Sequence, residues 1–161
     1  MDEILEILEN DARLTPEEIA KMVKKPVAKV KSLIKQYEKD GIILKYKTVI
    51  NKEMLHEERS GVRALIEVKV VPQKDVGFDY LAERIYRFPE VASCYLVSGS
   101  YDLLLIIEGK DIHTVSSFVA EKLAPMENVR GTVTHFLLKK YKEDRQILKR
   151  AERAKRPAIS F

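Results

Sequence analysis

Cysteine and long apolar runs are scarce in this sequence, and both absences narrow the classes of protein that it can encode. A single cysteine, Cys94, excludes an intramolecular disulfide, and its place inside an apolar stretch favours a small core residue. No apolar stretch approaches the ~18 residues of a membrane-spanning helix. No basic-then-apolar segment at the start resembles a signal peptide. We therefore expect a cytoplasmic protein with no membrane partner.

Motifs of catalysis and metal binding are missing as well. The sequence has no Cys-His metal spacing, no glycine-rich phosphate loop and no nucleophile elbow. Its three histidines, His56, His113 and His135, fall in a predicted linker, a predicted helix and a predicted strand. We therefore expect neither an enzyme nor a metal or other cofactor.

The composition that is present suits a soluble globular protein. The chain has 161 residues, of which 45% are hydrophobic and 34% charged, and this length suits one domain or two small ones. Its net charge of +4 is only mildly basic, so the distribution of charge is more informative than its total.

Three short helices are predicted in the first forty residues. Apolar residues in 4–8 form the stripe of the first helix, which stops at Asn10. Thr15, Pro16 and Glu18 form a capping-box pattern that starts the second helix. The third runs from Pro26, in a first-turn position, to Gly41. The alternation of apolar and polar residues through 42–50 predicts a β-wing, so that 1–50 is expected to form a winged helix-turn-helix domain.

Charge changes sign within these fifty residues. Residues 1–20 hold seven acidic residues and one arginine, whereas residues 21–47 hold nine lysines and two acidic residues. The polar face of the third helix and the lysines of the wing are therefore candidates to contact a DNA major groove and its phosphates. The alternative is an ordinary solvated face. The helix has no arginine, so the bidentate arginine contact to guanine is excluded there. The candidate DNA-binding residues are Lys25, Ala28, Lys29, Lys31, Ser32, Lys35, Gln36, Lys45 and Lys47.

The second half predicts a different architecture. Residues 51–61 are polar and form the expected linker, and residues 62–141 carry alternating strand and helix patterns in the order βαββαβ. We expect an α+β protein in which the winged helix-turn-helix precedes a ferredoxin-like, four-stranded antiparallel sheet with two helices on one face. Apolar residues such as Leu65 fall on the uncovered face of that sheet, which favours a homodimer formed sheet to sheet.

Five stretches, spread over both halves, carry a resemblance to a known family. In the first half they are IAKMV and VKSLIKQYEKDGIILKY, and in the second ALIEVKV, FPEVASCYLVSGSYDLLLIIEG and THFLLKKY. In these stretches the chain resembles the Lrp/AsnC (feast/famine) regulators of bacteria and archaea over about residues 1–141. Its GSYD stands where that family has a glycine-any-tyrosine/phenylalanine-aspartate turn.

The resemblance implies a mechanism. Family members dimerise through their sensor sheets, assemble into tetramers, octamers or larger rings, and bend DNA. An amino acid or related metabolite binds near the turn, at contacts between dimers, and changes assembly or DNA affinity. On this resemblance, Asp102 is a candidate to accept a hydrogen bond from an effector ammonium group and Tyr101 to supply a ring wall. The alternative is a tight turn that binds no ligand. The candidate effector-binding residues are Gly99, Ser100, Tyr101, Asp102, Thr132 and Thr134.

Some positions depart from the family pattern. Lys24 and Pro26 stand where many members have a turn glycine and a Ser/Thr cap, and Ser32 and Leu33 stand where arginines are common. These departures leave a second hypothesis open, a metabolite-sensing oligomer that acts through protein partners. The siroheme decarboxylases, enzymes that resemble this family, are a third hypothesis, which the scarcity of histidines disfavours.

Residues 142–161 extend beyond the predicted sensor domain. They contain seven basic residues against three acidic ones, and Ile147, Leu148 and Ala151 predict a short helix at their start. Such a tail either adds phosphate contacts or is a solubilising extension.

Overall fold

The computed structural model describes residues 2–51, 54, 61–71 and 77–148. The chain divides into two compact units, Met1–Ile50 and Asn51–Phe161. No described helix is both long enough and apolar enough to cross a membrane.

The first unit is built from the three predicted helices, α1 (Glu3–Asn10), α2 (Pro16–Met22) and α3 (Val27–Lys39). Each helix turns one apolar stripe inward, because residues three and four apart share a helix face. The stripes meet in one small core, whose buried residues are Ile4, Leu8, Ile19, Ala20 and Val30.

The prediction of a β-wing over residues 42–50 is wrong. Residues 42–50 are described throughout, and none of them is in a strand. Leu44 is 88% exposed, whereas the Tyr46 hydroxyl donates a 2.8 Å hydrogen bond to Glu38 of α3. Alternation of apolar and polar residues favours a strand only when a neighbouring strand pairs with its backbone, and this unit provides none over these residues.

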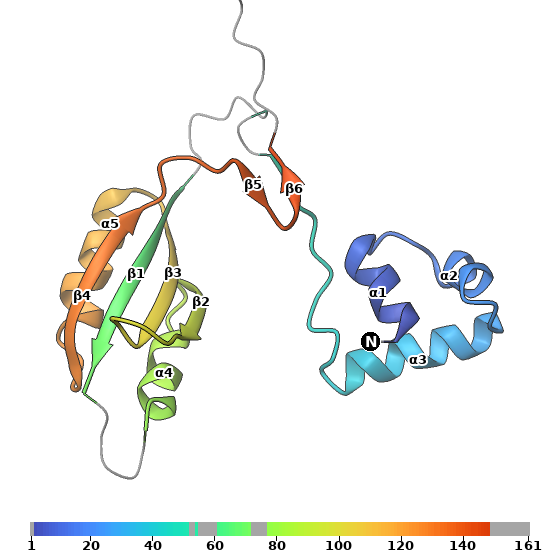
Figure 1. The fold of residues 1–161 in the computed structure, drawn as a ribbon, viewed down its shortest axis with the longest axis horizontal. Helices are drawn as coiled ribbons and strands as arrows, with labels where there is room; N and C mark the ends of the chain where they lie inside the picture. Colours follow the sequence, from blue (N-terminus) through green and yellow to red (C-terminus); the bar gives the residue numbers. More distant parts are fainter. Residues whose placement is uncertain (1, 52–53, 55–60, 72–76, 149–161) are drawn as a thin grey trace, which may run out of the picture. The chain divides into compact units, whose positions relative to one another are not determined.

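The second unit confirms the predicted βαββαβ order (Figure 1). Its antiparallel sheet has the strand order β2-β3-β1-β4. The strands are β1 (Val62–Val70), β2 (Val91–Leu96), β3 (Leu103–Gly109) and β4 (Val129–Phe136). The helices are α4 (Asp79–Tyr86) and α5 (Ile112–Ser117), the latter continuing as the π-helical turn η2 (Phe118–Leu123).

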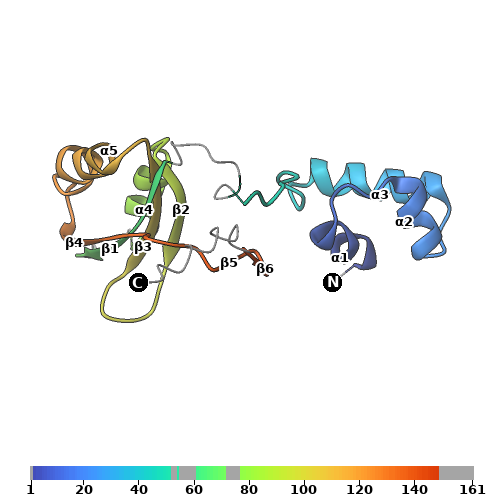
Figure 2. The ribbon, with the colours of Figure 1, turned by 90° about the horizontal axis from the view of Figure 1, so that it is seen from above.

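Alternation along the strands determines which side chains enter the core of this unit. In β1, Ala64, Ile66 and Val68 are fully buried, and their neighbours between them are not. The helices lie on the face to which these residues point (Figures 1 and 2). The opposite face of the sheet has no covering element among the described residues.

An ion pair and aromatic contacts hold the η2 segment against the residues directly before β2. The Lys122 ammonium group pairs with Glu90 and lies 5.6 and 5.9 Å from the ring centroids of Phe88 and Phe118, which meet edge to face. The hydrogen bond from Lys122 lowers the pKa of Glu90 below its ordinary value.

The helix predicted after residue 142 is also wrong. Lys142–Glu143 (β5) and Gln146–Ile147 (β6) instead form a small hairpin, whose two turn residues Asp144 and Arg145 both have positive φ, 44° and 64°. Such a two-residue loop is the geometry that suits a tight β-hairpin. Ala151 and the rest of the predicted tail, 149–161, lie outside the described residues.

Candidate functional site

Helix α3 is held in place by a well-capped α2 and the short turn between them. The predicted capping box is present: Glu18 N–H donates to Thr15 Oγ1 at 3.2 Å, and Thr15 N–H donates to Glu18 Oε2 at 2.8 Å. The turn passes through Lys24 at φ 51° and is closed by a hydrogen bond from Lys25 N–H to the Ala20 carbonyl. This helix-turn-helix therefore presents the polar face of α3 to solvent.

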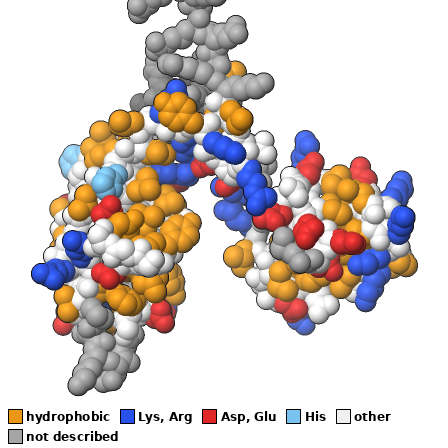
Figure 3. Space-filling view, viewed as in Figure 1, with side chains coloured by type: hydrophobic (Ala, Val, Ile, Leu, Met, Phe, Trp, Pro, Cys, Tyr) orange, Lys and Arg blue, Asp and Glu red, His pale blue; other side chains and the backbone are white. Residues whose placement is uncertain are grey.

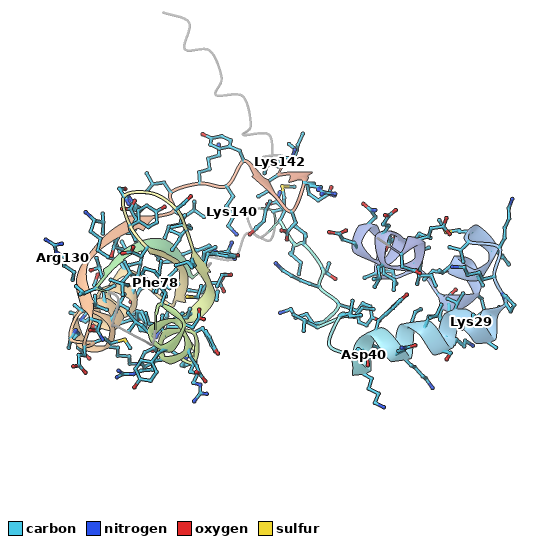
Figure 4. All side chains as sticks on the ribbon, turned by 60° about the horizontal axis from the view of Figure 1, so that its bottom comes forward. Lys29, Asp40, Phe78, Arg130, Lys140 and Lys142 are labelled. Atoms are coloured by element: carbon cyan, nitrogen blue, oxygen red, sulfur yellow. The ribbon has the colours of Figure 1, made fainter. Side chains whose placement is uncertain are left out.

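The candidate DNA-binding residues of α3 are nearly all exposed. Ala28, Lys29, Ser32, Lys35 and Gln36 are exposed, and Lys25 in the turn before the helix is half-buried. Lys29 and Asp40 mark opposite ends of the helix in Figure 4. Lys45 and Lys47 are exposed too, on the segment that lacks β-structure. The geometry leaves a row of cationic and hydrogen-bonding side chains along one helix face.

Lys31 differs from the other candidates. Its Nζ lies 2.6 Å from Glu17 Oε1 of α2, and the hydrogen bond from Lys31 lowers the pKa of Glu17. Both side chains are about half exposed, so the pair contributes little to stability. Sequence reasoning missed Glu17, because its partner lies on another helix fourteen positions away.

Acidic and basic side chains are segregated on this unit. Figure 3 shows acidic side chains grouped over α1 and lysines around α2 and α3. This arrangement agrees with the change of charge sign along the sequence, and it gives the α3 side of the unit a positive field.

The second candidate site is the turn between β2 and β3. Val97 N–H donates to the Asp102 carbonyl at 2.9 Å, which closes the turn. Gly99 has φ 155°, and a side chain there would meet nothing within 4 Å. Gly99 and Ser100 are exposed and Tyr101 is half-buried. Within the described part of the chain, the N–H groups of these three residues donate to no acceptor.

Asp102 is bound to the neighbouring strand. Its carboxylate Oδ2 accepts a 2.7 Å hydrogen bond from Val70 N–H, and its own N–H donates to the Val68 carbonyl at 3.1 Å. At this point the pairing of β1 with β4 shifts by one residue between Lys69 and Val70. The residue expected to accept a bond from an effector therefore already accepts one from β1.

The two candidate threonines lie apart from the turn. Thr132 pairs with Val68 and Thr134 with Ile66, so both belong to the half-buried row of β4 that shares a face with the core. Thr132 is separated from Leu103, the first residue after the turn, by the whole of β1, a distance of about 10 Å across the sheet. The structure does not bring the threonines and the turn together in one protomer.

The uncovered face of the sheet is apolar at its centre. Tyr95 and Val133 are each 50% exposed, and Leu65, Leu104 and Ile106 between them are half-buried. His135 Nε2 lies 3.0 Å from Glu67 Oε1 at the margin of this patch. Figure 3 shows hydrophobic side chains gathered over this unit on the face in view.

A helix-turn-helix with a basic helix face, followed by a βαββαβ sheet with an exposed turn, defines a class of proteins: DNA-binding regulators with a sensor domain. Comparison with known families agrees in both halves. The model described as winged helix-turn-helix DNA-binding matches residues 3–43, and the Lrp/AsnC ligand binding domain matches residues 63–147. The chain belongs to the Lrp/AsnC family of DNA-binding transcriptional regulators.

Individual relatives extend over nearly the whole chain. It is 46% identical over 158 residues to the uncharacterized HTH-type transcriptional regulator YugG of Bacillus subtilis, covering 98% of this chain and 95% of that protein. It is 28% identical to the HTH-type transcriptional regulator FL11 of Pyrococcus furiosus, covering 89% and 91% of the two chains.

Solved structures show the same fold. A transcriptional regulator of Neisseria meningitidis in complex with L-methionine matches with a TM-score of 0.67 and 28% identity, covering 89% of this chain and 93% of that one. A feast or famine regulatory protein of Mycobacterium tuberculosis, also complexed with L-methionine, matches with a TM-score of 0.67 and 24% identity over 91% and 95%. The second likeness bears on the fold alone.

Proposed function

We propose that this protein regulates transcription by binding DNA through α3, under the control of an amino acid bound at the Gly99–Asp102 turn. In this proposal residues 1–50 read DNA, residues 51–61 link the domains, and residues 62–141 bind effector and assemble the oligomer. The regulator works in the cytoplasm and without catalysis. The observation that supports the proposal is the match of one chain to a winged helix-turn-helix DNA-binding model over residues 3–43 and to the Lrp/AsnC ligand binding domain over residues 63–147.

The exposed face of α3 supports the DNA-binding part. Lys25, Lys29 and Lys35 are available to neutralise phosphates, and Ser32 and Gln36 lie among them as hydrogen-bonding side chains for base edges. Because no arginine lies on the helix, DNA shape is expected to contribute much of the discrimination between sequences.

A pair of lysines on the same helix tests this assignment. We expect Lys29→Ala to weaken binding to the protein's own upstream DNA by about three- to tenfold and to make the salt dependence of log affinity about one unit shallower. Lys31→Ala removes the same charge two residues away, from the side chain paired with Glu17, and is expected to change both quantities less. Fluorescence anisotropy over a salt series measures both.

Equal effects of the two variants would contradict the assignment of the Lys29 face to DNA. Equal affinity of the unaltered protein for upstream and scrambled DNA would indicate architectural rather than sequence-specific binding. Failure to bind either duplex would favour a sensor that acts through protein partners.

The turn supports the effector part of the proposal. The N–H groups of Gly99, Ser100 and Tyr101 have no acceptor among the described residues, and three such donors suit the carboxylate of an amino acid. L-methionine in the Neisseria meningitidis complex makes an amino acid the first ligand to test. Thr132 and Thr134 remain candidates to contact an effector that is bound at the turn of another protomer.

The uncovered sheet face supports the assembly part. The centre of this face is apolar, and a two-fold axis would bring the same patch of two copies together: Leu65, Tyr95, Leu104, Ile106 and Val133. We propose that two copies pair sheet to sheet and that dimers assemble into tetramers, octamers or larger forms.

A further inference from the structure

We propose that Asp102 positions the effector turn against β1 and does not itself bind the effector. This inference rests on the proposed function, in which the turn is the effector site. Asp102 is the one charged residue of the turn. If its carboxylate is bound to β1, the turn contacts the effector through other groups.

The hydrogen-bond requirement of Val70 carries the first step. Val70 is 8% exposed, and a buried backbone N–H without an acceptor is costly. The β1–β3 pairing ends at Val68 and Leu103, so β3 supplies no backbone carbonyl for Val70. The Asp102 carboxylate supplies the missing acceptor at 2.7 Å.

The same residue is held through its backbone, which carries the second step. Asp102 N–H donates to the Val68 carbonyl and the Asp102 carbonyl accepts from Val97 N–H. Three bonds therefore tie one residue to both β1 and the end of β2. The turn residues before it, Gly99 to Tyr101, have no comparable bonds among the described residues, so Asp102 is the anchor from which they project.

The place of attachment carries the third step. Val70 lies at the irregularity in the β1–β4 pairing, and the next residue, Val71, donates to the Asn128 carbonyl at 2.9 Å. The bond from Asp102 to Val70, the last residue of β1, and the bond from the next residue, Val71, thus link the turn to Asn128, directly before β4. A ligand that displaces the turn is therefore expected to shift the backbone at this irregularity, because Val70 is bonded to the turn and Val71 to Asn128.

The substitution Asp102→Asn separates the two roles. An amide oxygen accepts a hydrogen bond from Val70 N–H as a carboxylate oxygen does, but the side chain has no charge with which to pair an ammonium group. If Asp102 is an anchor, asparagine retains its function. If it binds the effector's ammonium group, asparagine loses it.

The experiment uses the full chain and the twenty L-amino acids, L-methionine first, with affinities measured by calorimetry. We expect Asp102→Asn to bind the effector within about threefold of the unaltered protein, and Asp102→Ala to lose at least about tenfold. Ser98→Ala, at an exposed residue of the same turn outside the candidate effector-binding set, is the matched control and is expected to keep both affinity and turn structure. Hydrogen exchange of the peptide that contains Val70 is followed in each variant, and we expect about tenfold faster exchange in Asp102→Ala alone.

Loss of effector binding by Asp102→Asn, with the Val70 amide still protected, would overturn the inference and return the carboxylate to the ligand. Unchanged exchange at Val70 in Asp102→Ala would overturn it as well. If the unaltered protein bound none of the twenty amino acids, the proposed effector function would fail together with this role, and the exchange data would still show whether the anchor exists. Asp102→Asn decides between the roles even if Asp102→Ala does not fold.

Discussion

Lys24 has a backbone conformation that side chains with a Cβ seldom adopt. Its φ of 51° lies in the left-handed region, in the turn where many members of the family have glycine. Lys24 therefore adopts, with strain, a backbone conformation that glycine adopts freely. A lysine in place of glycine at this position has an energetic cost, and the turn forms nevertheless.

We expect Lys24→Gly to stabilise the first unit by about 1 kcal/mol, because the relief of left-handed strain outweighs the added freedom of glycine in the unfolded chain. The same substitution at Lys21, inside α2, is expected to destabilise by about 1 kcal/mol, because glycine is a poor helix residue. Thermal unfolding followed by circular dichroism measures both. Destabilisation by Lys24→Gly would show that its side chain contributes more than the strain costs.

The β5–β6 hairpin illustrates how an element is held by contacts remote in sequence. Glu143 accepts hydrogen bonds from Lys140 at 2.7 Å and from Arg63 at 2.5 Å, and Arg63 also pairs with Glu108 of β3. The bond from Lys140 and then that from Arg63 lower the pKa of Glu143 below its ordinary 4.5. Glu143 is 21% exposed, so these interactions are partly shielded from solvent.

This lowered pKa predicts a pH dependence. A carboxyl with a lower pKa in the folded state stabilises the fold above its unfolded pKa, and the contribution is lost as the pH falls through the folded value. We expect Glu143→Gln to be less stable than the unaltered protein by about 1 kcal/mol at pH 7 and the difference to vanish well below pH 4.5. Melting temperatures across this range test it.

Glu121→Gln is the control, because Glu121 is exposed and has no ion pair among the described residues. Its melting temperature is expected to follow that of the unaltered protein at every pH. A Glu143→Gln difference that persisted unchanged at low pH would show that the charge of Glu143 is not what stabilises the hairpin.

At the scale of the whole molecule, the chain has two units with separate cores, and one apolar sheet face is left uncovered by the described residues. The larger core lies between the sheet and its helices, and no described element covers the other face of the sheet. Burying such a face on a second copy is the assembly that two-fold symmetry allows most simply.

We expect Val133→Lys to weaken the homodimer by at least about thirtyfold, the equivalent of about 2 kcal/mol, because a lysine there would be buried between two apolar faces. Val133 is 50% exposed in the single chain, so the fold of the protomer is expected to survive the substitution. Ile112→Lys, at another exposed apolar residue beyond the sheet, is the control. Sedimentation velocity over a concentration series measures both, and equal oligomers in the two variants would exclude this face.

Much of the fold was predictable because local pattern determines it. Helix and strand periodicity and the Thr15–Glu18 capping box depend on residues a few positions apart, and the structure confirms them. The wing over 42–50 and the helix after residue 142 were wrong, because a strand needs a partner and a short amphipathic pattern also suits a hairpin. The DNA-binding and effector residues remain predictions.

The sequence by itself determined the class of the protein: the order of helix-turn-helix and sheet, most of their elements, the change of charge sign and the GSYD turn. Only the tertiary structure decided what particular side chains are bound to. Asp102 meets Val70 across thirty-two positions, and Arg63 meets Glu143 across eighty. Periodicity reports which face a residue occupies, whereas a hydrogen bond depends on register, bulges and turn geometry that bring distant backbone and side chains within 3 Å.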